Sequence, residues 1–378
     1  MRILAAASGG EGHLGPLLPF VHAARDAGDD VLLVVPPALE DTARSTGCAV
    51  HVTDAPDAGE VRRVRQTMAS GDRATRVHAA EVELFGRLNT MAALPAMEAA
   101  AASFRPGLIL REPCDYASAV VATRRGIRTA QVGISPGRAD ISGLRLAAEV
   151  VEPLAPGLLA AVESAPYLTR FPLAEDTGFP DTRRYGFPGV HRGVAGAVEG
   201  RRASGTPLVW LTMGTVNSSF DESRGTWDAI LAAVADLPVR ALASTGRGGP
   251  ALVAPPNVEV VEWVELADIL GRADAVVCHG GSGTTLAALA AGLPLVVVPL
   301  IADQPANGAL VESVGAGIVV APAASERIRG LSAADVPRVR QAIGCVVEDD
   351  RYRDAAARVA RLSQGLPTVR EAMDALRP

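Results

Sequence analysis

The chain has 378 residues, of which 48% are hydrophobic and 4% aromatic, and its formal net charge is −6 at pH 7. This length favours two domains with cores of small aliphatic side chains. The acidic balance, without a basic block, argues against a nucleic-acid partner. All 36 basic residues are arginine, so a Schiff-base lysine and the Gly-Lys pair of a Walker A loop are both excluded.

Four scattered cysteines, at positions 48, 114, 278 and 345, lack the paired spacing of a metal site. Free cysteines of this kind fit a reducing compartment, and we expect a cytoplasmic protein. The first ten residues lack a long apolar region, so we predict no signal peptide. No apolar stretch reaches the ~20 residues of a membrane-spanning helix, and we expect no stable membrane anchoring.

The first half of the chain alternates apolar segments with helical patterns. Strands are predicted at residues 2–7, 31–35, 108–110 and 129–134, and a helix at 13–27. The segment at 31–35 is apolar without alternation, as in strands whose two faces are both covered. A parallel sheet between helices is therefore expected.

Residues 170–206 lose this periodicity and are rich in proline and glycine, and we place an interdomain linker at residues 186–206. A second alternating series follows, with strands predicted at 207–212, 240–244, 258–261, 275–278, 295–298 and 317–320. We therefore predict an N-terminal domain at 1–185, a second α/β domain at 207–350 and C-terminal helices at 351–378. Two such domains predict a ligand-binding cleft between them.

The segment HGGSGT, residues 279–284, lies between the predicted strand at 275–278 and a helical pattern at 285–291. A strand, a glycine-rich turn and a helix start present free backbone N–H groups and the positive end of a helix dipole to one point, which suits an anion such as phosphate. The segment also approaches the GxSxG nucleophile elbow. All six histidines precede Ser282, however, so chain order excludes that class of serine hydrolase.

A literal GxGxxG, from Gly10 to Gly15, follows the first predicted strand. A dinucleotide site would also need an acidic residue at the end of the second strand, where Pro36 and Pro37 stand, so we do not favour it. His13, within this motif, is expected at the carboxyl end of the sheet. The start of a helix disfavours imidazolium, so we expect His13 to remain neutral and able to accept a proton.

Carboxylates follow the predicted strand at 108–110. Glu112 or Asp115 could hydrogen-bond His13 if that strand neighbours the first, and would orient the imidazole and stabilise its charged form. Solvated loop acids are the competing interpretation. In the second half, Asp303 and Gln304 could hold vicinal sugar hydroxyls or simply cap a helix, and Trp263 could stack on a nucleobase or pack in a core.

Taken together, these residues resemble the bacterial family 1 glycosyltransferases of natural products, which have the GT-B fold. The resemblance covers nearly the whole chain and is most specific from Trp263 to Asn307, including CHGGSGT at 278–284 and AGLP at 291–294. It implies two Rossmann-like α/β domains facing across a cleft, with the C-terminal helix crossing back onto the N-terminal domain.

The resemblance also implies residue roles. His13 would be the general base for the acceptor, and Glu112 its partner. Trp263 and Val264 would lie beside the donor base, and Asp303 and Gln304 would hold the sugar. The remaining donor-site residues would be Gly12, Thr215, His279, Gly281, Ser282, Gly283 and Thr284.

The expected reaction is inverting transfer of a deoxysugar, from a dTDP or UDP donor used as co-substrate, to a hydrophobic natural product as the small-molecule acceptor. No cofactor is expected, and because the chain lacks an Asp-x-Asp pattern we expect no metal requirement. The acceptor would be recognised by loops at residues 55–95 and 134–150, with Asp140 as a contact or as a base for a carbon nucleophile. The sequence leaves open whether the protein forms a homodimer.

Three positions depart from the family pattern. Cys278 and Glu112 stand where His and Asp are more common, and Glu265 stands where relatives often have Pro. Three other functions remain open: a cell-wall lipid-intermediate transferase of the same fold, a sugar-nucleotide-binding auxiliary protein without turnover, and a sugar-nucleotide epimerase of the same fold. The first would favour a basic and apolar membrane-facing patch, which the sequence lacks. An intact His13 beside a carboxylate argues against the second.

Overall fold

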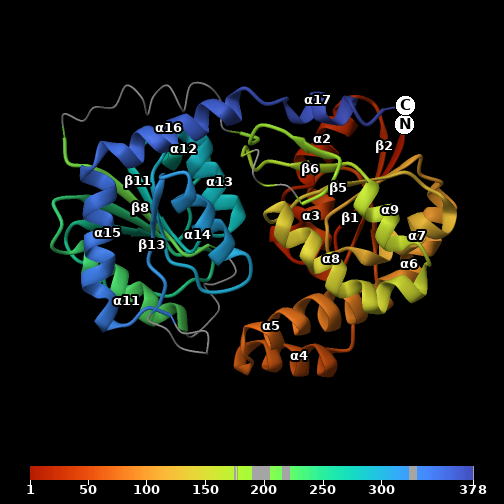
Figure 1. Cartoon of the computed structure of the whole chain (residues 1–378), viewed down its shortest axis with the longest axis horizontal. Coiled ribbons are helices and arrows are strands. Elements are labelled where there is room, and N and C mark those ends of the chain that lie inside the picture. The colour runs from red at the N-terminus through yellow and green to blue at the C-terminus, as the bar shows by residue number, and fades with distance from the viewer. Residues whose placement is uncertain (174–175, 177, 190–204, 215–221, 323–329, 378) are drawn as a thin grey trace. The chain divides into compact units, whose positions relative to one another are not determined.

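The computed structural model describes residues 1–173, 176, 178–189, 205–214, 222–322 and 330–377. The chain divides into two compact units, one formed by Met1–Tyr185 with Pro367–Pro378 and the other by Gly186–Leu366. Each unit contains one parallel sheet with helices packed on it (Figure 1). The predicted fold class, with two Rossmann-like α/β units, is therefore confirmed.

The first unit is built on seven parallel strands within the described residues. They are β1 (Arg2–Ala6), β2 (Asp30–Val35), β3 (Ala49–Val52), β4 (Leu108–Arg111), β5 (Thr129–Val132), β6 (Tyr167–Thr169) and β7 (Thr182–Arg184). Their order in the sheet is β3-β2-β1-β4-β5-β6-β7. The strand order reverses between β1 and β4, which is the switch point where open α/β sheets bind their ligands.

Helices cover both faces of this sheet. The helices of this unit are α1 (Glu11–Leu14), α2 (Leu18–Asp26), η1 (Pro37–Leu39), α3 (Glu40–Ser45), α4 (Ala58–Ser70), α5 (Arg73–His78), η2 (Ala79–Asn89), α6 (Thr90–Phe104), α7 (Tyr116–Arg125), α8 (Gly137–Val151), η3 (Glu152–Leu154), α9 (Leu158–Ser164) and α17 (Val369–Asp374). Among them, α4 and α5 pack on η2. The element η2 is a π-helix, a form that is rare and often found at functional sites.

The second unit repeats the design with six parallel strands within the described residues. They are β8 (Leu208–Thr212), β9 (Arg240–Ser244), β10 (Val258–Val261), β11 (Ala275–Cys278), β12 (Leu295–Val297) and β13 (Gly317–Val319), in the order β10-β9-β8-β11-β12-β13. The helices are α11 (Glu222–Val234), α12 (Leu266–Leu270), α13 (Ser282–Ala291), α14 (Gln304–Ser313), η5 (Ala333–Asp335), α15 (Val336–Glu348) and α16 (Asp350–Gln364). Here the order reverses between β8 and β11.

The central strands are apolar because both of their faces are covered. Every residue of β4 and of β11 is buried, and so are the last four residues of β1. Separate apolar clusters lie on the two faces of each sheet, composed mainly of Ala, Val and Leu. Burial of these side chains positions the loops that follow β1, β4, β8 and β11.

Several predicted elements need correction. The helix expected at 13–27 is broken into α1 and α2, because Pro16 cannot donate a backbone hydrogen bond. Residues 134–150 are not a loop, since α8 occupies most of them. The irregular composition after residue 170 conceals β7, a three-residue strand at the sheet edge without an apolar run. The strands β3 and β6 were also not predicted.

The C-terminal segment divides between the units. The first of the C-terminal helices is α16, which packs on α13 in the second unit. Only α17 belongs to the first unit, where it packs against α2 (Figure 1). Arg377 fixes this end by pairing with Asp29 at 2.7 Å. No helix in the described part of the chain is long and apolar enough to cross a bilayer.

Candidate active site

His13 and Glu112 meet at the switch point of the first sheet. The strand β1 leads into the loop that ends in α1, which carries His13, and β4 is directly followed by Glu112. Because β1 and β4 are paired in parallel, both side chains emerge at the carboxyl edge of the sheet. His13 Nδ1 lies 3.2 Å from Glu112 Oε2. The predicted pair is thus assembled from segments about a hundred residues apart.

Glu112 is held by hydrogen bonds in a fully buried position. Its Oε1 accepts from the backbone N–H of Ser8 at 3.1 Å and from the Ser8 hydroxyl at 3.0 Å. Its Oε2 accepts from the backbone N–H of Cys114 at 2.6 Å. Burial raises the pKa of Glu112, but the charge and contact of His13 and these N–H groups outweigh it, so the net pKa shift is downward. The carboxylate is therefore ionised and rigid.

The pKa of His13 is shifted in the direction opposite to the one that a helix start favours. Burial lowers the pKa of His13, but the charge and contact of Glu112, with the charges of Glu81 and Asp140, produce a net upward shift from its ordinary value. The expectation of a neutral imidazole rested on the dipole of a helix start. The direction of the pKa shift is instead upward, because α1 is only four residues long and the carboxylate is much closer.

Asp115, the other candidate partner, has a different contact. Its carboxylate accepts from the backbone N–H of Ser118 at 2.9 Å and caps α7. Gly9 is a contributor that the sequence did not reveal, because a Cβ at this position would lie 2.3 Å from the His13 ring. The absent side chain of Gly9 therefore creates the space in which His13 stands.

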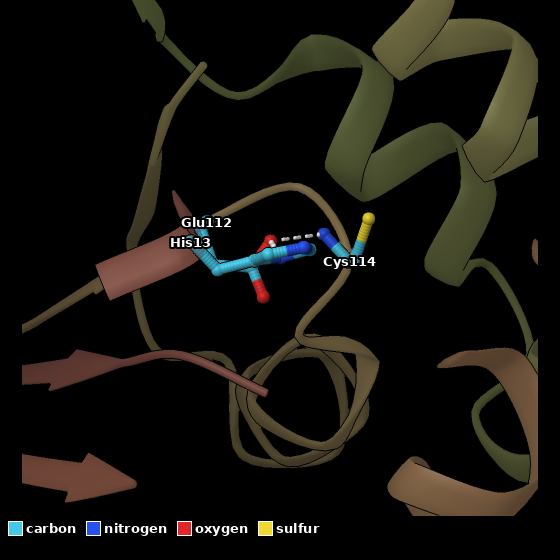
Figure 2. A group of neighbouring side chains, drawn as sticks. All are labelled: His13, Glu112 and Cys114. Atoms are coloured by element: carbon cyan, nitrogen blue, oxygen red, sulfur yellow. Dashed lines mark hydrogen bonds and ion pairs between the residues drawn. The ribbon is translucent and has the colours of Figure 1, made fainter. Parts of the chain in front are cut away.

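His13, Glu112 and Cys114 are grouped closely enough to suggest a metal site (Figure 2). Their potential ligand atoms all lie within 4.8 Å of one another. A metal would require the thiolate of Cys114, but burial, followed by the charge of Glu112, raises the pKa of this thiol well above its usual range. Both oxygens of Glu112 already accept hydrogen bonds. This donor set is poorly suited to a cation.

Two further residues near His13 were missed by the sequence analysis. The Phe85 ring of η2 has its centroid 5.1 Å from that of His13. Glu81, on the same helix, interacts electrostatically with both His13 and Glu112. Burial raises the pKa of Glu81 to about 7, and the charge of His13 opposes that shift. Neither residue follows a predicted strand, so the sequence contains no signal that places them near His13.

Asp140 lies on α8 and is nearly fully buried. Its Oδ2 accepts from the Tyr167 hydroxyl at 2.6 Å and from the backbone N–H of Ile134 at 3.3 Å. Burial raises the pKa of Asp140 well above its usual range. The observed contacts thus give Asp140 a role in fixing the turn before α8.

The predicted anion site of the second unit has the expected strand-turn-helix form. The strand β11 ends at Cys278, Gly280 takes a positive φ of 86°, and Gly281 is the N-cap of α13. No side chain among the described residues caps this helix. The backbone N–H groups of its first turn, at residues 282–284, therefore have no side-chain acceptor in the described part of the chain, as an anion-binding turn requires.

His279 is packed between glycines of the two switch-point loops. A Cβ at Gly214, after β8, would lie 2.4 Å from the His279 ring, and one at Gly281 would lie 2.3 Å from it. Burial lowers the pKa of His279 to about 4. The imidazole is therefore neutral at physiological pH and can offer an N–H group but no positive charge.

Asp303 is joined to the anion-binding turn by a network of hydrogen bonds. The Ser282 hydroxyl donates to Asp303 Oδ2 at 2.6 Å, so its proton is not directed at a ligand. The buried Asn307 Nδ2 lies 2.8 Å from the Gly280 carbonyl, 3.0 Å from Ser282 Oγ and 2.9 Å from Asp303 Oδ2. Asn307 is thus the centre that fixes the turn and the carboxylate relative to each other.

Gln304 holds the loop before α14. Its Oε1 accepts from the backbone N–H groups of Leu300 and Ile301 at 2.8 and 2.9 Å. Ala302, within this loop, has a positive φ of 53°, which is unfavourable for a residue with a Cβ and is often found at functional sites. The loop is therefore held in a strained form that presents Asp303.

Trp263 is exposed rather than packed in a core, with 48% of its surface accessible. Its indole N–H donates to Glu265 Oε1 at 3.2 Å, and the Arg247 guanidinium lies 5.4 Å from the ring centroid. Glu265 thus holds the indole N–H. Val264 is half-buried against the apolar cluster beside β11.

Of the remaining predicted donor-site residues, three are placed by the structure and one is not described. Gly12 lies in α1 and is exposed, with open space where a Cβ would be. Gly283 and Thr284 lie in the first turn of α13. Thr215 lies outside the described residues, directly after Gly214.

Comparison with known proteins gives consistent results across the chain. A family model described as Erythromycin biosynthesis protein CIII-like, C-terminal domain, matches residues 228–377. The elloramycin glycosyltransferase ElmGT of Streptomyces olivaceus is 30% identical over 395 residues, covering 97% of this chain and 99% of the relative. The tylactone mycaminosyltransferase of Streptomyces fradiae is 28% identical, covering 94% and 87%.

Solved structures agree with the fold. The spinosyn rhamnosyltransferase SpnG, complexed with thymidine diphosphate, has a TM-score of 0.80 at 21% identity, with both chains covered completely. SnogD from Streptomyces nogalater has a TM-score of 0.71 at 22% identity and covers 100% of this chain and 98% of its own.

Proposed function

The chain belongs to the bacterial natural-product glycosyltransferases, and we propose that it moves a sugar from a nucleotide diphosphate to a hydrophobic small-molecule acceptor with inversion. The observation that carries this proposal is the His13–Glu112 pair, with its 3.2 Å contact at the switch point of the first sheet. A histidine beside an ionised buried carboxylate is the arrangement of a general base.

The acceptor oxygen attacks the anomeric carbon from the face opposite the diphosphate. As the new C–O bond forms, the bond from that carbon to the diphosphate oxygen breaks, and the electron pair leaves with the diphosphate. His13 receives the acceptor proton on Nε2, since its Nδ1 faces Glu112. Glu112 stabilises the imidazolium that results, and such a base contributes on the order of 10²–10⁴-fold.

The second unit supplies the donor site in this proposal. The free N–H groups at the start of α13 and the neutral His279 donate hydrogen bonds to the diphosphate. Asp303 accepts hydrogen bonds from sugar hydroxyls, and Trp263 lies under the base. The helix start takes the role that a divalent cation has in other transferases, so we propose transfer without a metal.

Thymidine diphosphate, the ligand in a solved structure of SpnG, is the first donor nucleotide to test. The relatives' names include mycaminosyl and demethylnoviosyl transferases, which favour a deoxysugar donor. A thermal-shift panel of dTDP, UDP, ADP and GDP at saturation tests the donor class, since a ligand that binds only the folded state raises the Tm. A rise with dTDP or UDP alone supports the proposal, and no rise with either contradicts it.

Transfer itself separates this proposal from a binding protein without turnover. Purified protein with a dTDP- or UDP-sugar and a panel of polyketide aglycones is expected to release the nucleoside diphosphate only when an acceptor is present. Nucleotide binding without release for any acceptor favours the auxiliary function instead.

A further inference from the structure

Glu81 is a carboxyl group beside the proposed base whose role is not explained by the mechanism. It lies on η2 and reaches against α8 at Gly143. A Cβ at Gly143 would lie 2.6 Å from Glu81 Oε2 and 3.0 Å from its Cδ. The glycine thus provides the space that this carboxyl group occupies.

The same helix presents an apolar ring to the base. Phe85 follows Glu81 by four residues, so the two side chains lie on the same side of η2. The Phe85 ring lies 5.1 Å from the His13 ring, tilted by 36°. Glu81 and Phe85 therefore form one wall beside His13, with a polar group and an aromatic face.

The other carboxyl groups around His13 all receive hydrogen bonds from the protein. Glu112 accepts from Ser8 and Cys114, Asp115 from Ser118, and Asp140 from Tyr167. Glu81 is half-buried, and its carboxyl group accepts no hydrogen bond from the described residues, with which it interacts electrostatically. Its oxygens are therefore free to accept a hydrogen bond from a bound molecule.

The charges near Glu81 favour a neutral hydrogen-bond donor over an anion. Glu81 interacts electrostatically with His13 of α1, with Glu112 and Cys114 of the loop after β4, and with Tyr116 of α7. Asp140 contributes from α8, through its effect on His13.

The remaining charged residues of η2 cannot serve Glu81. Glu83 pairs with Arg87 at 2.8 Å, and Arg87 also pairs with Glu60 of α4 at 2.9 Å. No cation of this helix is therefore left for Glu81.

We propose that Glu81 binds a second hydroxyl of the acceptor, on the carbon next to the one whose hydroxyl His13 deprotonates. Phe85 packs on the ring that carries both hydroxyls, so the acceptor is an aromatic vicinal diol. This inference rests on the proposed glycosyl transfer and names its acceptor class. Glu81 acts here as an acceptor-binding residue that sets which hydroxyl reaches His13.

Two matched probes test this proposal by calorimetric titration of the full chain saturated with dTDP. These are 2-naphthol and 2,3-dihydroxynaphthalene, which differ by one hydroxyl. Wild type is expected to bind the diol about tenfold more tightly, the effect of one charge-assisted hydrogen bond. Glu81→Leu is expected to bind both equally, and the control Glu83→Leu, on the same helix, to keep the wild-type ratio.

Ionisation provides a second readout. The carboxylate is a better acceptor than the carboxylic acid, so the preference of wild type for the diol is expected to grow between about pH 6 and about pH 8. Glu81→Gln cannot ionise and is expected to give a ratio independent of pH. Gly143→Ala, which favours the helix but displaces the Glu81 carboxyl group, is expected to reduce the ratio without loss of stability.

Equal affinity of wild type for the two probes, or binding of neither, overturns the proposal. So does an unchanged ratio in both Glu81→Leu and Gly143→Ala. These results differ from a failure of the proposed function, which would appear as no dTDP binding and no sugar transfer. If transfer occurs and depends on His13, but the ratio of the two probe affinities is the same with and without Glu81, only this inference is wrong.

Discussion

His13 Nδ1 lies 3.2 Å from Oε2 of Glu112, a carboxylate with no exposed surface. The contact opposes the effect of burial on His13 and raises the pKa of the imidazole. A base must be unprotonated to act, so kcat/KM is expected to rise with pH through a value above the ordinary pKa of histidine. Glu112 thus orients the His13 imidazole and raises its pKa.

Glu112→Gln is expected to move this acid limb to lower pH, because burial then determines the His13 pKa. The rate at the plateau should fall by on the order of 10²-fold or more, since the imidazolium loses its partner. The pH profile of kcat/KM measures both effects. Asp115→Asn is the control: it weakens the cap of α7 but is expected to leave the limb in place. If the acid limb of the kcat/KM profile stays at its wild-type pH in Glu112→Gln, a group other than His13 is responsible for it.

Gly9→Ala is expected to reduce kcat strongly, because its Cβ would lie 2.3 Å from the His13 ring and displace it. Gly10→Ala places a Cβ in open space and is expected to keep most of the activity. Transfer rates of the two variants, with dTDP affinity as a check on folding, measure the difference. Equal losses in both would contradict the placement of His13.

Asn307→Ala is expected to weaken dTDP-sugar binding and to lower stability by about 1–3 kcal/mol, since it leaves buried hydrogen-bonding groups unpaired. The affected groups are the Gly280 carbonyl and Asp303. Ser313→Ala, at the exposed end of the same helix, is the control. Denaturant unfolding and donor titration measure the two effects. Unchanged donor affinity in Asn307→Ala would show that this network does not shape the donor site.

His279→Gln is expected to weaken dTDP binding by the same factor at every pH from about 5.5 to about 8.5, because a group with a pKa of about 4 stays neutral throughout. The comparison with wild type at each pH removes the titration of the diphosphate itself. A factor that grows steeply towards acid pH would mean that His279 binds as a cation.

Chelation provides a test of the proposed metal independence. Transfer by protein treated with EDTA and dialysed is expected to equal that of untreated protein, because backbone N–H groups at the start of α13 stabilise the leaving diphosphate. Loss of activity that Mg²⁺ or Mn²⁺ restores would contradict this part of the proposal.

The residues that follow apolar strands were predictable from the sequence. His13, Glu112 and His279 each stand at the carboxyl end of a strand whose composition marks it as buried, and parallel sheets bring those ends together. The sequence could not choose between Glu112 and Asp115, because that choice depends on which side chain the Ser8 and Cys114 donors hold.

Residues placed by helix packing were not predictable. Glu81 and Phe85 lie in a long helical region of mixed polarity, and they approach His13 only because η2 packs against α8. The upward pKa shift of His13 was missed for a related reason, since its sign depends on three carboxyl groups from separate elements. Short edge strands such as β7 have too few apolar residues to show a pattern.

The most direct test of the general-base assignment is the single-turnover rate of His13→Ala, measured together with its dTDP affinity. We expect a fall in rate on the order of 10²–10⁴-fold with dTDP affinity within a factor of about two. Transfer by His13→Ala at the wild-type rate, with donor binding intact, would contradict the assignment of His13 as the base.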